Sequence, residues 1–307
     1  MTAYGLLGAV LVLGVWFVYL HQIDGFEPTR LWYSVIILAG GMIFSCFVPP
    51  LYDAFALGFR PNGTYLNDLF YYVLAVGLIE ETLKIIPVIL VIRLTPAIER
   101  PVDYIIYGSM SALGFAFMEN LLPGSEWKLR AISTRALGAV ILHMAETSLV
   151  MYGLFYSTYR VKKRRLQYFF LAFGAACALH GIFDFFTAKG LGVLGLLIMI
   201  YCIRQYGIFI NCALNLSERN REPPKRQLDL TAYLCYSLTA IIMLQYVIIA
   251  VTYGPSNANS AFLGTAFFSY FLIFLILVYL GNFEIQKGQW LSLLRRKAIS
   301  HVSVPSE

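Results

Sequence analysis

The chain has 307 residues, of which 59% are hydrophobic and only 13% are charged. Soluble globular domains contain about 25% charged residues, so this composition excludes an ordinary soluble protein and indicates a membrane protein. A formal net charge of +6 in a soluble chain would be compatible with nucleic-acid binding. In so apolar a chain it indicates membrane orientation instead, and we expect no nucleic-acid partner.

Apolar segments recur along the chain and predict one all-α polytopic membrane domain over residues 1–307. The apolar segments 166–188 and 190–215 are separated only by Lys189 and Gly190, so a count of about eight spans also fits. Pro49 and Pro50 predict a kink or an early end in the apolar segment 31–57. At about 20 residues for each crossing, about nine transmembrane helices are expected, near residues 4–20, 31–57, 66–92, 103–122, 131–158, 166–188, 190–215, 230–253 and 261–281.

Basic residues predict the orientation of these spans, because Lys and Arg favour cytoplasmic loops. With the N-terminus outside, the inner loops and the tail hold 16 of the 23 basic residues, and the outer loops hold five. The densest group is the run RVKKRR at 160–165. We therefore expect an outer N-terminus, a cytoplasmic C-terminus and a multi-pass protein of the cell membrane.

The spans fall into two groups with different content. Residues 66–188 form a predicted catalytic core of four spans, and it contains most of the ionisable side chains found within spans. Residues 217–229 are polar and predict a cytoplasmic linker. The two accessory spans that follow, over 230–281, contain almost no ionisable side chain and are expected to face lipid or to act as a scaffold.

Ionisable side chains within the core indicate a function. A charged group near the bilayer centre costs several kcal/mol, so its presence requires a reason. The residue types are those that serve as acid, base or metal ligand. They occur as EETLK at 80–84, FAFMEN at 115–120, His143 with Glu146 and Thr147, and HGIFD at 180–184.

Helical spacing indicates which of these side chains share a helix face. Glu80 and Lys84 are four residues apart, so Lys84 can hold the Glu80 carboxylate, and this pair could be purely structural. Glu81 projects about 100° away. It has no partner at that spacing, which makes it the better candidate for chemistry. Asp184 lies one turn after His180 and is expected to orient its imidazole.

Depth along each span tests whether the side chains can meet. Counting about 1.5 Å per residue from the outer ends puts His143, His180 and Glu80 in the outer half of the bilayer or near its midplane. Glu119 lies closer to the outer surface and could instead mark the wet end of its helix, with Asn120 as a C-cap. A water-filled cavity open to the outside would reach the whole set.

Together, the four motifs resemble those of the PrsW family of intramembrane proteases, namely E-E-x-x-K, F-x-x-x-E-N and two histidine motifs, over residues 75–190. The related CAAX prenyl endopeptidases have F-x-x-x-H and an Arg where this chain has FAFMEN and Lys84. The resemblance implies a membrane-embedded endopeptidase that makes the first, outer-side cut in a single-span anti-sigma factor. That reaction belongs to signalling by intramembrane proteolysis.

Two mechanisms for peptide hydrolysis remain open. In one, His143, His180 and Glu119 hold Zn²⁺ and another glutamate acts as base. In the other, Glu80 or Glu81 and a histidine act on water without a metal. We favour the metal because two histidines and several carboxylates on separate helices suit it and the family is described that way, although H-E-x-x-H is absent. The predicted catalytic residues are Glu80, Glu81, Glu119, His143 and His180, and the supporting residues are Lys84, Asn120, Thr147 and Asp184.

Other functions remain as alternatives. A CAAX-type prenyl-protein endopeptidase would cut on the cytoplasmic side. A transporter or proton relay predicts inverted repeats or paired broken helices, which the sequence does not show. An assembly factor without catalytic activity predicts loss of motif residues, yet all are present. The expected partners of the protease are a single-span membrane protein as substrate and the lipid bilayer.

Overall fold

The structure is a computed structural model that describes residues 3–23, 30–55, 59–121, 132–161, 166–217, 228–291 and 298–299. Helices account for nearly all of this part of the chain, in agreement with the all-α prediction. Two short strands, β1 (Trp290–Leu291) and β2 (Ala298–Ile299), pair antiparallel. The helices are α1 (Ala3–Gln22), α2 (Leu31–Ser45), α3 (Val48–Phe55), α4 (Tyr65–Tyr71), η1 (Tyr72–Gly77), α5 (Leu78–Leu94), α6 (Pro101–Leu121), α7 (Ile132–Thr134), η3 (Arg135–Ala139), α8 (Val140–Tyr159), α9 (Leu166–Ala188), α10 (Gly192–Leu216), α11 (Leu230–Tyr253) and α12 (Pro255–Leu280).

Seven helical segments of the described residues are long and apolar enough to cross a membrane, as in a multi-pass membrane protein. Two of the nine predicted spans are not among them. They are the continuous helix from α4 to α5 and helix α6, and both contain charged residues of the motifs. The seven segments are Gly5–Gln22, Leu31–Phe55, Arg135–Tyr159, Leu166–Ala188, Gly192–Leu216, Leu230–Tyr253 and Pro255–Leu280.

The structure places breaks where the sequence predicted them. α2 ends at Ser45 and α3 begins at Val48, so Pro49 and Pro50 lie in the first turn of α3, where a missing N–H leaves no helical bond unmade. Between α9 and α10, Gly190 has φ +70°, a left-handed conformation that glycine adopts freely. The sixth and seventh segments are therefore separate helices. Of the predicted polar linker, 218–227 lie outside the described residues.

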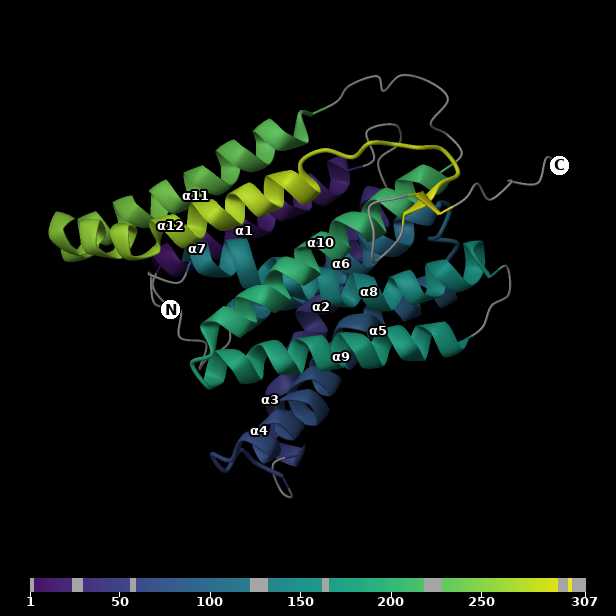
Figure 1. Cartoon of the computed structure of the whole chain (residues 1–307), viewed down its shortest axis with the longest axis horizontal. Helices are drawn as coiled ribbons and strands as arrows, with labels where there is room; N and C mark the ends of the chain where they lie inside the picture. Colours follow the sequence, from purple (N-terminus) through teal and green to yellow (C-terminus); the bar gives the residue numbers. More distant parts are fainter. Residues whose placement is uncertain are drawn as a thin grey trace.

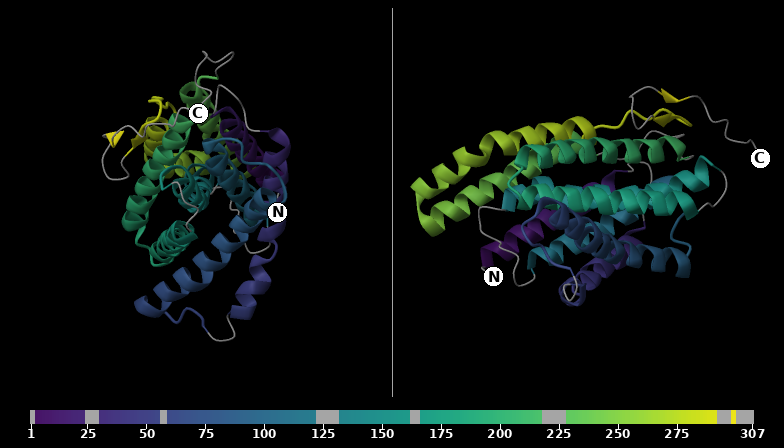
Figure 2. Two further views of the ribbon diagram at one scale, coloured as in Figure 1. Left: turned by 90° about the vertical axis from the view of Figure 1, so that its right-hand side faces the viewer. Right: turned by 60° about the horizontal axis from the view of Figure 1, so that its bottom comes forward.

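Helices α2, α6, α8 and α9 pack in succession, and α10 covers α6, α8 and α9. The accessory helices α11 and α12 pair with each other along one side of the molecule, and α1 packs against α11 (Figure 1). Figure 2 shows this pairing from two further sides. The short helices α3 and α4 project at the bottom edge of Figure 1. Most residues of α6 and α8 are buried, so the ionisable motifs lie in the interior.

Glycines let α2 and α6 approach backbone to backbone. A Cβ at Gly41 would overlap the carbonyl oxygen of Ser111, and a Cβ at Gly114 would overlap that of Leu38. Small residues allow such contact between membrane helices, where packing and not the hydrophobic effect drives association. This contact sets the position of α6 and hence of the acidic residue near its end.

Candidate active site

The acidic motif follows directly on a π-helical turn. Helices α4, η1 and α5 are continuous, and the wider turn η1 ends at Gly77, three residues before Glu80. Single π-helical turns within α-helices are frequent at functional sites. The side chains of Glu81 and Lys84 are fully buried, and Glu80 is 7% exposed. These charges are therefore held inside the protein and not at its lipid-facing surface.

Two glycines place η1 against α9. A Cβ at Gly77 would overlap the carbonyl oxygen of Cys177, and a Cβ at Gly181 would overlap the carbonyl group of Tyr72. Since Gly181 directly follows His180, this close approach brings the acidic motif of α5 beside the histidine of α9. The glycine of the HGIFD motif is thus explained by packing.

We expect Gly181→Ala to lower the thermal unfolding temperature of the detergent-solubilised protein. Its Cβ would meet backbone atoms that cannot give way, and overpacking of this kind typically costs about 1–3 kcal/mol. Gly174→Ala on the same helix is the matched control, because a Cβ at Gly174 meets no atom within 4 Å. The control should unfold at or above the wild-type temperature. Equal unfolding temperatures for both variants would contradict the packing described here.

The ammonium group of Lys84 lies at the centre of a buried cluster. Its Nζ is 2.8 Å from Glu81 Oε1 and 3.3 Å from Glu80 Oε2. It is also 2.7 Å from His143 Nδ1 and 3.3 Å from His180 Nδ1. An ammonium group can only donate, so His143 Nδ1 accepts and the neutral ring carries its proton on Nε2. Lys84 thus links both glutamates of the motif to both histidines.

The imidazole of His180 has carboxylates on both sides. Nδ1 lies 3.1 Å from Glu81 Oε1 and 3.0 Å from Glu146 Oε2. On the other side, Nε2 lies 3.3 Å from Glu80 Oε2 and 3.4 Å from Asp184 Oδ2. Carboxylates therefore lie beside both ring nitrogens of His180 and fix the orientation of the ring, and the Lys84 ammonium lies 3.3 Å from Nδ1 as well. The predicted orienting residue, Asp184, contacts the Nε2 side of the ring.

Helix α6 brings Glu119 to His143. Glu119 Oε2 lies 3.0 Å from His143 Nε2, and Arg135 Nη2 donates to Glu119 Oε1 over 2.8 Å. Since Glu119 is two residues from the end of α6, this helix ends at the level of His143. Glu119 and His143 therefore lie side by side, although counting residues from the outer ends of the spans had placed Glu119 closer to the outer surface. Arg135 belongs to none of the four sequence motifs.

The remaining predicted residues lie behind or beside this cluster. The Thr147 hydroxyl donates to Glu81 Oε2 over 3.0 Å, so Glu81 is held by α8 as well as by Lys84. Asn120 is buried at the end of α6 and is not among the described residues that line the cavity.

A cavity of about 310 Å³ opens onto the cluster. Three glutamates line this cavity, and each has a buried carboxylate oxygen there that is poorly satisfied: Glu80 Oε2, Glu119 Oε2 and Glu146 Oε1. Glu80 Oε2 has ion-pair contacts with Lys84 and His180, and Glu119 Oε2 has one with His143. Burying several carboxylates in one place is costly unless a cation lies among them, and a bound metal ion would add one. The cavity is lined by Glu80, Glu119, Thr134, Arg135, Gly138, Ala139, Leu142, His143, Glu146, His180, Phe183, Asp184, Thr187, Met199 and Phe268.

The residues present fit a divalent metal ion. Two groups of side chains offer ligand atoms within 4.8 Å of one another. Lys84 Nζ lies within 3.3 Å of three members of the first group, which therefore already surrounds a cation. The second group faces the cavity and contains two of the three poorly satisfied oxygens. The first group is Glu81, His143, Glu146 and His180, and the second is Glu80, Glu119 and His143.

The contact between Tyr52 and Glu80 was not predicted from the sequence. It lies on α3 and donates its hydroxyl to Glu80 Oε1 over 2.7 Å. The chain has 21 tyrosines, many of them in apolar segments, so nothing in the sequence distinguishes this one.

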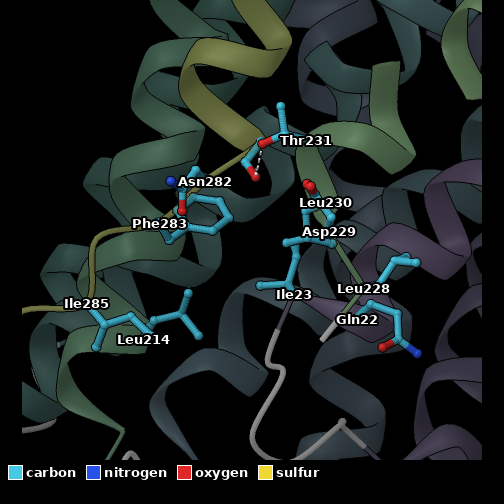
Figure 3. Close-up of a pocket in the computed structure, with 11 residues that line it drawn as sticks. Gln22, Ile23, Leu214, Leu228, Asp229, Leu230, Thr231, Asn282, Phe283 and Ile285 are labelled. Atoms are coloured by element: carbon cyan, nitrogen blue, oxygen red, sulfur yellow. Dashed lines mark hydrogen bonds between the residues drawn. The ribbon is translucent and has the colours of Figure 1, made fainter. Parts of the chain in front are cut away.

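A second cavity, of about 520 Å³, lies at the ends of α1, α10, α11 and α12 (Figure 3). Two polar side chains that line this cavity make hydrogen bonds at the ends of helices. Asp229 caps α11 by accepting from the backbone N–H of Ala232, and the Thr231 hydroxyl donates to the Gly281 carbonyl over 2.9 Å. This cavity contains no cluster of acid, base and histidine side chains among the described residues, in contrast to the first.

A comparison with protein families identifies the family of this chain. The model of the PrsW family intramembrane metalloprotease matches residues 27–210, which is more than half of the chain. The match extends beyond the four motifs and includes α2, α3 and most of α10. Comparisons with curated proteins and with solved structures found no match. The chain therefore belongs to the PrsW family of intramembrane metalloproteases.

Proposed function

We propose that this intramembrane protease is metal-dependent and cuts a single-span membrane protein, of the anti-sigma-factor type, near the outer side of the membrane. The observation that carries the proposal is the convergence of Glu80, Glu119, His143 and His180 on one cavity. The carboxylates of Glu80 and Glu119 face the two imidazoles there, with Glu80 Oε2 3.3 Å from His180 Nε2 and Glu119 Oε2 3.0 Å from His143 Nε2.

His143, His180 and Glu119 would hold the ion. This set takes His143 and Glu119 from the group that faces the cavity and His180 from the other group, and its nitrogen and oxygen ligands suit Zn²⁺. A bound Zn²⁺ supplies a Lewis acid that lowers the pKa of water and polarises a carbonyl. His180 would bind through Nε2, because the neighbours of that nitrogen, Glu80 and Asp184, both line the cavity. Binding through His143 Nε2 would require that nitrogen to carry no proton, so Lys84 would have to release His143 Nδ1 and keep its contacts with the carboxylates of Glu80 and Glu81.

Glu80 is the side chain best placed to take the proton from water. Glu80 lines the cavity, and its Oε1 accepts from the Tyr52 hydroxyl. A general base must reach the proton that it abstracts. Oε2, whose contacts are the ion pairs with Lys84 and His180, is the oxygen left to accept that proton. Glu81, in contrast, is fully buried between Lys84 and Thr147, where it fixes their positions. We therefore assign the base to Glu80 and a supporting role to Glu81.

A second mechanism has one observation in its favour. Because Lys84 donates to His143 Nδ1, the neutral ring has an N–H at Nε2, which points to Glu119. Without a metal, that N–H could polarise a peptide carbonyl while Glu80 acts as base. Sensitivity of cleavage to chelation distinguishes the two mechanisms.

The predicted orientation of the chain favours a cut on the outer side of the membrane. With the N-terminus outside, α6 ends and η3 begins on the outer side, so Glu119 and Arg135 lie near the outer end of the bundle. Apolar side chains of Leu142, Phe183 and Met199 line the same cavity beside the carboxylates. Such a mixed lining suits a peptide segment that leaves a transmembrane helix.

The proposed function predicts where the substrate is cut. The purified protein, reconstituted in liposomes with a single-span substrate that has a different tag at each end, should release the outer part. Mass spectrometry of the products should place the cut near the outer end of the substrate span. A cut at the cytoplasmic end would support the CAAX-type alternative, and intact substrate would exclude this protease activity toward it.

A further inference from the structure

We propose that Tyr52 is a positioning residue of the reaction. Its hydroxyl holds the Glu80 carboxylate so that Oε2 faces the cavity. The inference rests on the proposed function, in which Glu80 takes the proton from water. Tyr52 lies on α3, outside all four sequence motifs, and donates to Glu80 Oε1 over 2.7 Å.

Apolar packing fixes the direction of the Tyr52 ring. Val48, one turn earlier on α3, forms a small buried cluster with Ile79, Leu83 and Phe115, and Tyr52 packs against this cluster. Ile79 immediately precedes Glu80, so the ring and the carboxylate are anchored to the same turn of α5. A ring held in this way determines where its hydroxyl can lie.

The Tyr52 hydroxyl counteracts the attraction of the Glu80 carboxylate to Lys84. Glu80 Oε2 lies 3.3 Å from the Lys84 ammonium and 3.3 Å from His180 Nε2. An ammonium group can draw both oxygens of a carboxylate toward itself, and that would turn Glu80 away from the cavity. A hydrogen bond from a hydroxyl to a carboxylate is short and strong, because the acceptor is charged. Tyr52 therefore keeps Oε1 on the α3 side and Oε2 at the cavity.

The break between α2 and α3 makes this contact possible. α2 packs against α5 and α6, whereas α3 packs against α5 and η1. Other side chains of α3, including Leu51 and Phe55, are exposed, so α3 borders the site at the edge of the bundle. The broken second span thus supplies the site with a side chain that a straight helix would direct elsewhere.

The test is Tyr52→Phe, which removes only the hydroxyl. Loss of a group that orients a reacting side chain typically costs about 10- to 100-fold in activity. We expect kcat to fall by about that factor and KM to stay within about twofold, because substrate contacts are unchanged. Zinc affinity, measured in competition with a chromogenic chelator, should equal that of the wild type, since Glu80 is not assigned as a ligand.

Tyr233→Phe is the matched control. The Tyr233 hydroxyl is also partly buried and donates to the Val15 carbonyl over 3.0 Å, on the accessory helix α11. Its removal should lower the unfolding temperature about as much as Tyr52→Phe does and leave kcat unchanged. A loss of kcat confined to Tyr52→Phe therefore separates positioning from general destabilisation.

The outcomes distinguish this inference from the proposed function. If Tyr52→Phe retains wild-type kcat while Glu80→Gln is inactive, the inference is overturned and the function stands. If zinc affinity falls and kcat at saturating zinc does not, the inference is also overturned, because Tyr52 would then position a metal ligand. If Glu80→Gln cleaves as fast as the wild type, the assigned role of Glu80 fails, and this inference fails with it.

Discussion

Glu80→Gln is expected to reduce kcat by about 10²- to 10⁴-fold, the usual contribution of a general base. Glutamine has the same shape and can still accept from Tyr52, but its amide cannot take a proton from water. The variant should therefore fold and bind zinc like the wild type. The measurement is the rate of cleavage of a tagged single-span substrate in liposomes, with zinc content determined on the same sample.

Glu99→Gln provides the control for Glu80→Gln. Glu99 is exposed and pairs with Arg30, away from the cavity. The same chemical change at this position should leave kcat unaltered. Retention of full activity by Glu80→Gln would contradict the assignment of Glu80 as base.

Glu81→Ala is expected to destabilise the fold strongly. Glu81 and Lys84 are both fully buried and lie 2.8 Å apart. Removing one member of a buried ion pair typically costs about 3–5 kcal/mol, because the other charge loses its compensation. The unfolding temperature in detergent should fall well below that of the wild type, and the yield of monodisperse protein should fall with it.

Two further variants test the cause of that loss. Glu81→Gln removes the charge but can still accept from Lys84 or Thr147, so it should be less destabilising than Glu81→Ala. Glu99→Ala, at an exposed glutamate, should unfold close to the wild-type temperature. Equal unfolding temperatures for Glu81→Ala and Glu99→Ala would show that the buried pair is not a stability determinant.

The sequence was sufficient to predict the class of fold and the composition of the cluster. Apolar segments of suitable length predicted the helices, and the cost of burying charge identified Glu80, Glu119, His143 and His180 as exceptional. The structure brings these four side chains to one cavity. The motif residues could be identified because a charged side chain in an apolar span is conspicuous without any knowledge of packing.

The roles of the two neighbouring glutamates could not be predicted in the same way. The spacing of four residues suggested that Lys84 would pair with Glu80 and that Glu81 lacked a local partner. In the structure, Lys84 is 2.8 Å from Glu81, three residues away, and 3.3 Å from Glu80. Both spacings bring side chains together on a helix. Contacts from neighbouring helices decide between them, here those of Thr147 and Tyr52.

The contacts of Tyr52 and Arg135 with the site could be identified only from the tertiary structure, for a related reason. A tyrosine or an arginine near the end of a membrane span is ordinarily an interfacial residue. The break after α2 and the turn η3 direct these two side chains to Glu80 and Glu119 instead. No local pattern in the sequence encodes such a contact between helices distant along the chain.

Metal analysis of the purified protein, combined with chelation and add-back in the cleavage assay, tests the proposed metal site most directly. We predict about one zinc ion per chain, as in a mononuclear hydrolytic site. Chelation should abolish cleavage, zinc or cobalt should restore it, and His180→Ala should contain no zinc and show no activity. Full cleavage by metal-free protein in the presence of chelator would contradict the metal-dependent mechanism.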